Sequence, residues 1–254
     1  MNTRLSMRAF ALVPLAAAAL SLGADPAAAQ APAQRPVQTP QASATVDLTG
    51  EWVSVVTGDW KFRMVTPGKG VFDGVPLNAE GRRIGSAWDP KQDTANGDEC
   101  RAYGAGNIMR MPGRLRIQWN DGNTLRIETD AGTQTRLLNF GPAAQPAEPS
   151  WQGSTHAEWH RPTGPAAAGT GGSIKAVTTG LRPGYLRKNG APYSDATVLT
   201  EYFERLSAPN GDSWLVVTQI VNDPKYLSRP YITSANFKKI TDGQGWHPTP
   251  CSAP

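Results

Sequence analysis

From about Leu48 onward, apolar and polar residues alternate in short runs that are rich in β-branched and aromatic side chains. Glycine- and proline-containing turns separate these runs. Alternation with a period of two is typical of β-strands that bury one face. The first two predicted strands form a hairpin across Gly58 and Asp59. In full, the pattern predicts strands at residues 52–57, 61–66, 108–111, 114–119, 124–129, 133–140, 151–160, 173–179, 197–206, 214–221 and 231–240.

One helix is predicted at residues 78–87, where Asn78 can cap the N-terminus and Glu80 lies in the first turn. Asp89 and Pro90 are expected to end it. Short turns join most of the predicted strands, and closing the sheet on itself removes exposed strand edges. We therefore predict an all-β fold: a single antiparallel up-and-down barrel of lipocalin-like type with one short helix. A two-sheet β-sandwich is the alternative.

The N-terminus has the three parts of a secretory signal peptide. Two arginines precede an apolar run at residues 9–22, and small residues follow up to Ala29. The run is too short to span a bilayer, so we predict a signal peptide at residues 1–29, with a retained membrane anchor as the alternative. Cleavage after Ala29 predicts a periplasmic or secreted protein without an integral membrane segment.

Residues 30–45 are rich in proline, glutamine, alanine and threonine and contain almost no residues that could build a core. Such a segment cannot offset the entropy of ordering, so it is predicted to be a disordered, dispensable leader. Residues 46–254 are long enough for one core and are predicted to form a single β-barrel domain.

Charge and motifs argue against several classes of function. Cleavage of the signal peptide removes two arginines and one aspartate, which lowers the formal net charge from +4 to +3. The remaining lysines and arginines are scattered, so no nucleic-acid partner is predicted. His156 and His160 would lie ~13 Å apart on a strand, too far for one metal ion. No catalytic or phosphate-binding motif is present in the sequence, and neither a metal nor a cofactor is predicted.

The chain contains two cysteines, Cys100 and Cys251. An even number of cysteines in an exported protein predicts a disulfide, here between a loop and the C-terminal tail. A metal or redox pair is the alternative. It is disfavoured because neither cysteine has a second cysteine or a histidine at ligand spacing.

Glu201 alternates in phase with Leu199 and Phe203, which points its carboxylate toward the apolar interior. A buried carboxylate needs a cation or hydrogen-bond donors. Arg136 shares a strand face with Leu138 and is the preferred partner. The pair is predicted to be a polar anchor in an apolar pocket, with Phe203 beside it. A structural ion pair inside a filled barrel is the alternative.

Two further sets of polar residues are candidate site residues. Tyr185, Tyr193 and Asp195 belong to a turn-rich loop near the predicted rim of the barrel, where they could contact a ligand or move a proton. The alternative is a rigid loop that plugs the barrel end. Arg126 and Glu128 share one face of a predicted strand and are candidate ligand contacts. A solvated outer face with ion pairs is the other interpretation.

Two motifs near the end of the chain carry a resemblance: the turn Gly190-Ala191-Pro192-Tyr193-Ser194-Asp195 and the later strand Thr200-Glu201-Tyr202-Phe203. In these, the chain resembles a family of uncharacterised exported bacterial β-rich proteins. That family usually has histidine where Tyr193 stands and arginine where Tyr202 stands. The resemblance implies export and a single β-rich domain, without implying a substrate. It extends over residues 47–50, 88–90, 100, 126–130, 177–179 and 222–224.

These observations predict a periplasmic lipocalin-like protein that binds a small apolar or aromatic molecule in a barrel cavity. The alternative is a cofactor-independent enzyme, an isomerase, lyase or hydrolase that uses a carboxylate with Tyr or Arg in the same cavity. A structural envelope protein without a cavity is a third possibility. The catalytic candidates are Glu201, Tyr193 and Asp195, and the ligand-binding candidates are Arg136, Phe203, Tyr185, Arg126 and Glu128.

Overall fold

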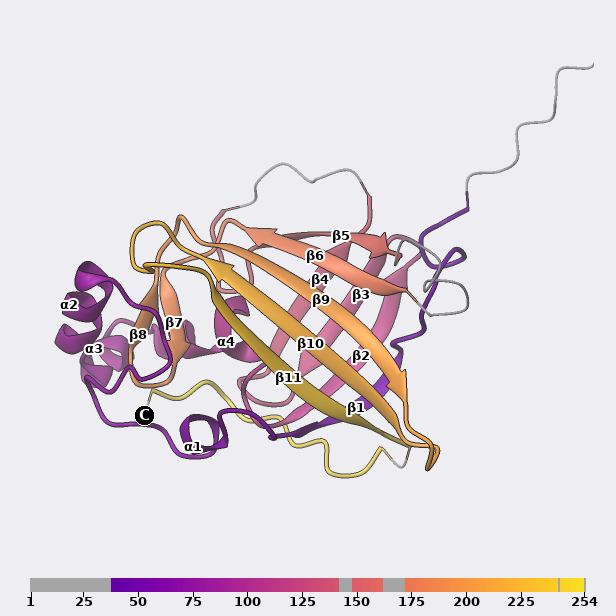
Figure 1. The fold of residues 1–254 in the computed structure, drawn as a ribbon, viewed down its shortest axis with the longest axis horizontal. Coiled ribbons are helices and arrows are strands. Elements are labelled where there is room, and N and C mark those ends of the chain that lie inside the picture. Colours follow the sequence, from indigo (N-terminus) through magenta and orange to yellow (C-terminus); the bar gives the residue numbers. More distant parts are fainter. Residues whose placement is uncertain (1–37, 142–147, 162–171, 242, 254) are drawn as a thin grey trace, which may run out of the picture. The chain divides into compact units, whose positions relative to one another are not determined.

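The computed structural model describes residues 38–141, 148–161, 172–241 and 243–253, which belong to one compact unit. Nine strands close into a barrel in the order β1-β11-β10-β9-β6-β5-β4-β3-β2, which confirms the predicted all-β barrel (Figure 1). The barrel strands are β1 (Gly50–Val55), β2 (Arg114–Asp121), β3 (Thr124–Thr129), β4 (Gln134–Asn139), β5 (Ser154–His160), β6 (Ser173–Thr179), β9 (Val198–Ser207), β10 (Ser213–Asn222) and β11 (Tyr231–Ile240).

One neighbouring pair in this ring is parallel. β4 pairs with β5 in parallel, through Leu138 with Thr155 and Asn139 with His156, whereas every other neighbouring pair of the ring is antiparallel. A closed ring must reverse strand direction an even number of times. A ring of nine strands therefore contains at least one parallel pair, and this barrel contains one.

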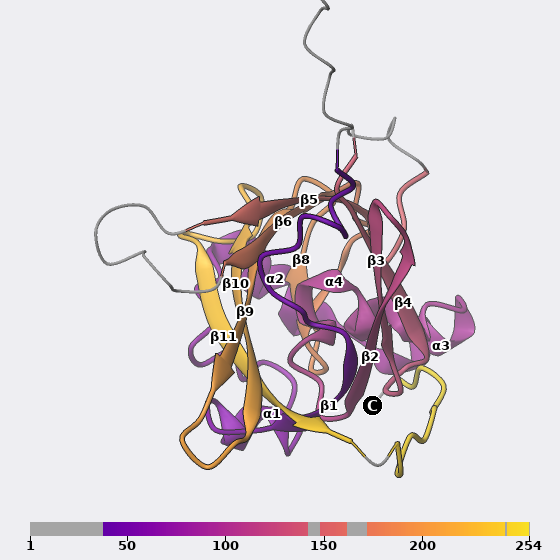
Figure 2. The same cartoon turned by 90° about the vertical axis from the view of Figure 1, so that its right-hand side faces the viewer.

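Helices gather at one end of the barrel, between β1 and β2 in sequence (Figure 1). They are α1 (Trp60–Arg63), α2 (Ala79–Ala87), α3 (Pro90–Ala95), the 3-10 helix η1 (Glu99–Tyr103) and α4 (Ala105–Ile108). The hairpin β7 (Gly184–Arg187) and β8 (Ala191–Tyr193) lies at the same end. Figure 2 shows α4 behind the ring of strands.

The helix predicted at residues 78–87 is confirmed, and its cap is the expected one. The Asn78 side chain accepts a hydrogen bond from the Gly81 N–H. Asp89 and Pro90 follow the end of α2 but also begin α3, because Asp89 caps the Lys91 N–H and Pro90 occupies the first turn. The chain therefore has more helices than the one expected.

The strands predicted at residues 61–66 and 108–111 are wrong. β1 finds its partners in β2 and β11, so it needs no hairpin partner, and Asp59 in the left-handed region starts α1 instead. Ile108 and Met109 are buried at the end of α4. Short apolar runs fit a buried helix face as well as a strand, which explains the error.

The folded unit begins before the predicted boundary at residue 46. The Gln41 N–H donates to the Gly122 carbonyl at 3.1 Å, and the Trp159 indole N–H donates to the Pro40 carbonyl at 3.0 Å. Residues 38–45 therefore belong to the folded unit, not to a disordered leader. The predicted signal peptide and residues 30–37 of the predicted leader lie outside the described residues.

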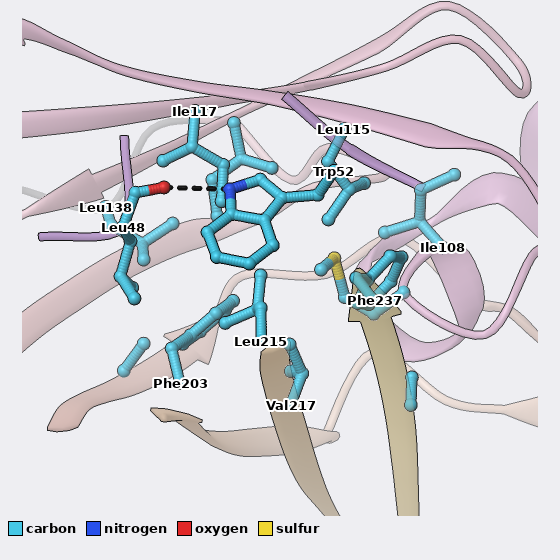
Figure 3. Close-up of a cluster of buried hydrophobic side chains, with 14 of the residues drawn as sticks. Leu48, Trp52, Ile108, Leu115, Ile117, Leu138, Phe203, Leu215, Val217 and Phe237 are labelled. Atoms are coloured by element: carbon cyan, nitrogen blue, oxygen red, sulfur yellow. Dashed lines mark hydrogen bonds between the residues drawn. The ribbon is translucent and has the colours of Figure 1, made fainter. Parts of the chain in front are cut away.

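Two apolar clusters follow one another along the barrel. The barrel cluster surrounds Trp52, whose indole N–H donates to the Leu48 carbonyl at 2.9 Å, and includes Phe203 and Phe237 (Figure 3). The cap cluster lies toward the helices and includes Tyr193 and Leu199. The barrel cluster therefore fills much of the strand cylinder with side chains.

The predicted disulfide between Cys100 and Cys251 is confirmed. It ties the C-terminal tail to η1, and the tail is also held by the Thr249 N–H, which donates to the Asp130 carbonyl at 2.9 Å. Within the described part of the chain, no helix has the length and apolar character needed to cross a membrane.

Candidate functional site

A buried ion pair joins β4 and β9 between the two apolar clusters. Both Arg136 Nη atoms donate to the Glu201 carboxylate, with 2.9 Å between Nη1 and Oε1 and a second bond from Nη2 to Oε2. Arg136 is 1 % exposed and Glu201 0 % exposed. The predicted partnership is therefore confirmed, and alternation along each strand explains it.

Three more side chains extend this ion pair across the barrel. Gln219 on β10 donates to Glu201 Oε1 at 3.1 Å and to the Ala105 carbonyl of α4 at 3.3 Å. Arg136 Nη2 donates to Thr178, which shares a hydrogen bond with Thr155 at 2.8 Å. We call these five residues the polar layer. Its hydrogen bonds offset part of the desolvation cost of two buried charges.

Apolar residues bound the polar layer on both sides. On β9, Leu199 belongs to the cap cluster and Phe203 to the barrel cluster, with Glu201 between them. Neither Glu201 nor Arg136 lines either of the two pockets described below. This geometry favours the alternative of a structural ion pair inside a filled barrel.

Tyr193 on β8 is buried in the cap cluster rather than displayed on the rim. Its hydroxyl has no hydrogen-bond partner among the described residues and packs against the backbone of Gly104 and Gly184. Burial raises the pKa of the Tyr193 phenol above its usual value, although the charges of Arg101 and Arg136 oppose this shift. A proton-transfer role would need this phenol to ionise, which burial disfavours.

Tyr185 belongs to a second buried network, at the start of the β7–β8 hairpin. Its hydroxyl donates to Asp93 at 2.8 Å, and Asp93 also accepts from the Trp88 indole at 2.9 Å and from Arg101 at 2.8 Å. Burial, and then the bond to Asp93, raise the pKa of the Tyr185 phenol. These four residues line a pocket of about 220 Å³. Sequence reasoning missed Asp93, because nothing in the pattern separates it from a solvated helix residue.

Three predicted site residues lie on the surface, away from the ion pair. Asp195 is exposed and accepts a hydrogen bond from Lys225 at 2.6 Å, which lowers the pKa of its carboxyl. Arg126 and Glu128 pair with each other on the outer face of β3. Their strand places the neighbouring Leu125 and Ile127 inside, so both polar side chains must point outward. The structure does not bring these three residues together with Glu201.

A larger pocket, of about 550 Å³, lies at the helical end of the barrel. We call it the end pocket. It is formed by α1 and the residues after it, η1, α4, the β3–β4 turn, the end of β7 and the disulfide-held tail. Its lining comprises Phe62, Arg63, Met64, Thr66, Tyr103, Asn107, Arg110, Met111, Pro112, Ala131, Arg187, Lys188, Thr249, Pro250 and Ser252.

Three arginines of the end pocket are held by different contacts. Arg110 Nη2 donates to Asp59 at 2.9 Å, and Arg63 Nε donates to the Arg110 carbonyl at 2.8 Å. Arg187 Nη1 donates to the Asp73 carbonyl at 2.6 Å, and its guanidinium lies 4.3 Å from the centroid of the Phe62 ring. Burial and then the charge of Arg110 lower the pKa of Arg63 to about 10.

Sequence reasoning missed most of the end pocket. Arg63 and Arg110 lie in segments that the sequence pattern predicts as strands, and the tertiary fold brings them together with Arg187. The sequence signal for the end pocket is an arginine beside aromatic or apolar residues in each segment. This pattern is too common to identify a site.

The fold and the sites define a class: a closed nine-stranded β-barrel with an internal polar layer and a helical cap. Comparisons with protein-family models, curated proteins and solved structures find no match for this chain. In the part of the chain that the structure describes, no three His, Cys, Asp or Glu side chains gather as a metal site.

Proposed function

We propose that this protein acts in the periplasm or outside the cell and binds a small molecule with an aromatic or apolar body in the end pocket. The observation that carries the proposal is the end pocket itself, whose volume is about 550 Å³. Sites for small ligands usually enclose about 300–1,000 Å³ and combine apolar walls with a few polar groups. The proposed ligand site thus lies at the helical end of the barrel, whereas the sequence predicts one inside the strand cylinder.

The walls of the end pocket suit such a ligand. Phe62, Tyr103 and Met111 supply aromatic and thioether surface, and Met64 adds an exposed apolar side chain. Thioether side chains adapt to ligands of different shape. The disulfide and the N-terminal sequence pattern support the proposed location, since disulfides persist mainly in oxidising compartments.

The enzymatic alternative has weaker support. It needs Glu201 or Asp195 to move a proton in a cavity where Tyr193 or Arg136 stabilises the developing negative charge. Glu201 is paired bidentately with Arg136 and lies between two apolar clusters, and Asp195 lies on the surface. A binding function in the end pocket does not require the ligand to reach the polar layer.

The test fills the end pocket with a larger side chain. Thr66 is exposed and lines the pocket, so Thr66→Trp should block the pocket without disturbing the core. Thr135→Trp on the exposed face of β4 is the matched control. Binding of the neutral probe 1-N-phenylnaphthylamine is measured by fluorescence titration. We expect Thr66→Trp to weaken binding at least about tenfold and Thr135→Trp to leave it unchanged. Equal binding by both variants would overturn the proposal.

A further inference from the structure

We propose that the ligand of the end pocket is an anion: a small molecule that joins a carboxylate or a similar oxyanion to an aromatic or apolar body. This inference rests on the proposed function and specifies the chemical class of its ligand. Three features of the end pocket support it: an excess of positive charge, buried arginine N–H groups and aromatic contacts.

The described lining of the end pocket contains four cations and no carboxylate. The cations are Arg63, Arg110, Arg187 and Lys188. Asp59 pairs with Arg110 from beside the pocket, and its side chain is 43 % exposed. Asp73 contributes only its backbone carbonyl to Arg187. The pocket therefore keeps an excess of positive charge that a bound anion would neutralise.

Several guanidinium N–H groups in this lining are buried without an acceptor among the described residues. Within the described ranges, Arg187 is 2 % exposed and has no partner for Nε or Nη2, and Arg110 is 3 % exposed and has none for Nε. Arg63 Nη2 likewise lacks a partner among these residues. Leaving buried charged donors unpaired is costly, so arginines at such positions call for an acceptor.

Arg136 is a useful comparison, because its partner is a buried carboxylate of the same chain. Both of its terminal nitrogens donate to the Glu201 carboxylate, and only Nε has no acceptor among the described residues. In contrast, no arginine of the end pocket has a buried carboxylate of its own among the described residues. A ligand carboxylate would neutralise the positive charge of these arginines, and the planar guanidinium fork matches its two oxygens.

Aromatic rings hold two of these cations in place beside the pocket. Arg187 stacks on Phe62, and the Lys188 ammonium lies 5.0 Å from the centroid of the Tyr103 ring. Burial raises the pKa of Tyr103, but hydrogen bonding to Lys188 and Ser252 outweighs burial and lowers it below its usual value. The same rings offer surface to an aromatic ligand body, so charge recognition and apolar contact can occur side by side.

The test compares two probes of nearly equal shape, 2-naphthoate and 2-naphthamide, by isothermal titration calorimetry at neutral pH. We expect wild-type protein to bind 2-naphthoate about tenfold or more tightly than 2-naphthamide, because charge-assisted hydrogen bonds exceed neutral ones. Arg187→Gln should reduce that preference to less than about threefold. Arg83→Gln, which removes an exposed arginine of α2, should leave it unchanged.

Lys188→Met provides a second variant in case Arg187→Gln fails to fold, and it should also reduce the preference. Near-ultraviolet circular dichroism reports whether each variant is folded. Equal affinity for the two probes, or failure to bind 2-naphthoate while 1-N-phenylnaphthylamine still binds, would overturn the anionic class and leave the proposed function standing. Unchanged binding of 1-N-phenylnaphthylamine by Thr66→Trp would overturn the proposed function itself.

Discussion

Glu201 and Arg136 neutralise one another at a depth where both are nearly inaccessible to water. Removing the carboxylate leaves a buried guanidinium without a counter-ion, a change that typically costs about 3–5 kcal/mol. We therefore expect Glu201→Gln to lower the free energy of unfolding by about this amount. Urea denaturation followed by tryptophan fluorescence measures it.

Glu128→Gln is the matched control, because Glu128 makes an ion pair of the same type on the outer face of β3. Its loss should cost less than about 1 kcal/mol. Replacing both buried partners, by Arg136→Met with Glu201→Leu, should recover most of the stability that Glu201→Gln loses. Unchanged stability in Glu201→Gln together with lost ligand binding would contradict the structural role and favour a functional one.

The Tyr193 hydroxyl in the cap cluster has no hydrogen-bond partner in the part of the chain that the structure describes. An unsatisfied buried hydroxyl costs about 1–3 kcal/mol, so Tyr193→Phe should raise the free energy of unfolding at neutral pH by about 1 kcal/mol. Tyr202→Phe on β9, a partly exposed position, serves as the control. A destabilised Tyr193→Phe protein would show that the hydroxyl has a partner or a role that the described contacts do not contain.

The same residue predicts how stability changes at alkaline pH. Burial raises the pKa of the Tyr193 phenol in the folded state, and the unfolded phenol titrates near about pH 10. The stability that depends on the neutral phenol is complete below that value and is lost as the pH rises above it. Tyr193→Phe should therefore lose less stability than wild-type protein between about pH 9 and pH 11 in thermal unfolding. Parallel losses would contradict the prediction.

At the scale of elements, Trp88 packs against the turn of the β7–β8 hairpin. Gly190 in this turn has φ +80°, and a Cβ there would overlap the Trp88 indole. Gly70 has a similar φ of +83°, but a Cβ there would meet nothing within 4 Å. Substituting each glycine therefore distinguishes the cost of backbone strain from the cost of displacing a packed side chain.

Gly70→Ala should cost about 1–2 kcal/mol, because only the left-handed backbone opposes it. Gly190→Ala should cost about 1–3 kcal/mol more, because it also displaces Trp88. Differential scanning calorimetry of both variants measures the difference. Equal losses would show that the indole can move away without penalty.

Elements that carry a local sequence signal could be predicted, and elements without one could not. The meander at residues 114–139 and the helix at residues 78–87 were predictable, because alternation and capping are local signals. The short helices α1 and α4 were not, since their apolar runs are too brief to show a period. The same limit hid the end pocket, because its cations lie on these segments and meet only in the tertiary fold. By contrast, the ion pair of Glu201 was predictable from strand alternation alone.

At the scale of the whole molecule, the disulfide links residues that are 151 positions apart. In the chain-entropy model, a cross-link of this length contributes about 5 kcal/mol to stability. The double substitution Cys100→Ser with Cys251→Ser should therefore lower the melting temperature. It should also weaken binding of 1-N-phenylnaphthylamine, because Thr249, Pro250 and Ser252 form a wall of the end pocket.

Reduction of wild-type protein with dithiothreitol should reproduce both effects of the double substitution, and the serine variant itself should not respond to dithiothreitol. Melting curves and fluorescence titrations, with and without reductant, measure these effects. Full probe binding after reduction would show that the hydrogen bonds of the tail hold the wall without the disulfide.

The parallel pairing of β4 with β5 is the place where the strands of the barrel should separate most easily. Only two residue pairs join these strands, whereas β9 and β10 share ten. Amide hydrogens of residues 137–139 and 154–156 should therefore exchange with deuterium well before those of residues 199–206, which hydrogen–deuterium exchange mass spectrometry can resolve. Arg136 and Thr155 stand on opposite strands of this junction, so each opening would briefly hydrate the buried charges from the side of the barrel.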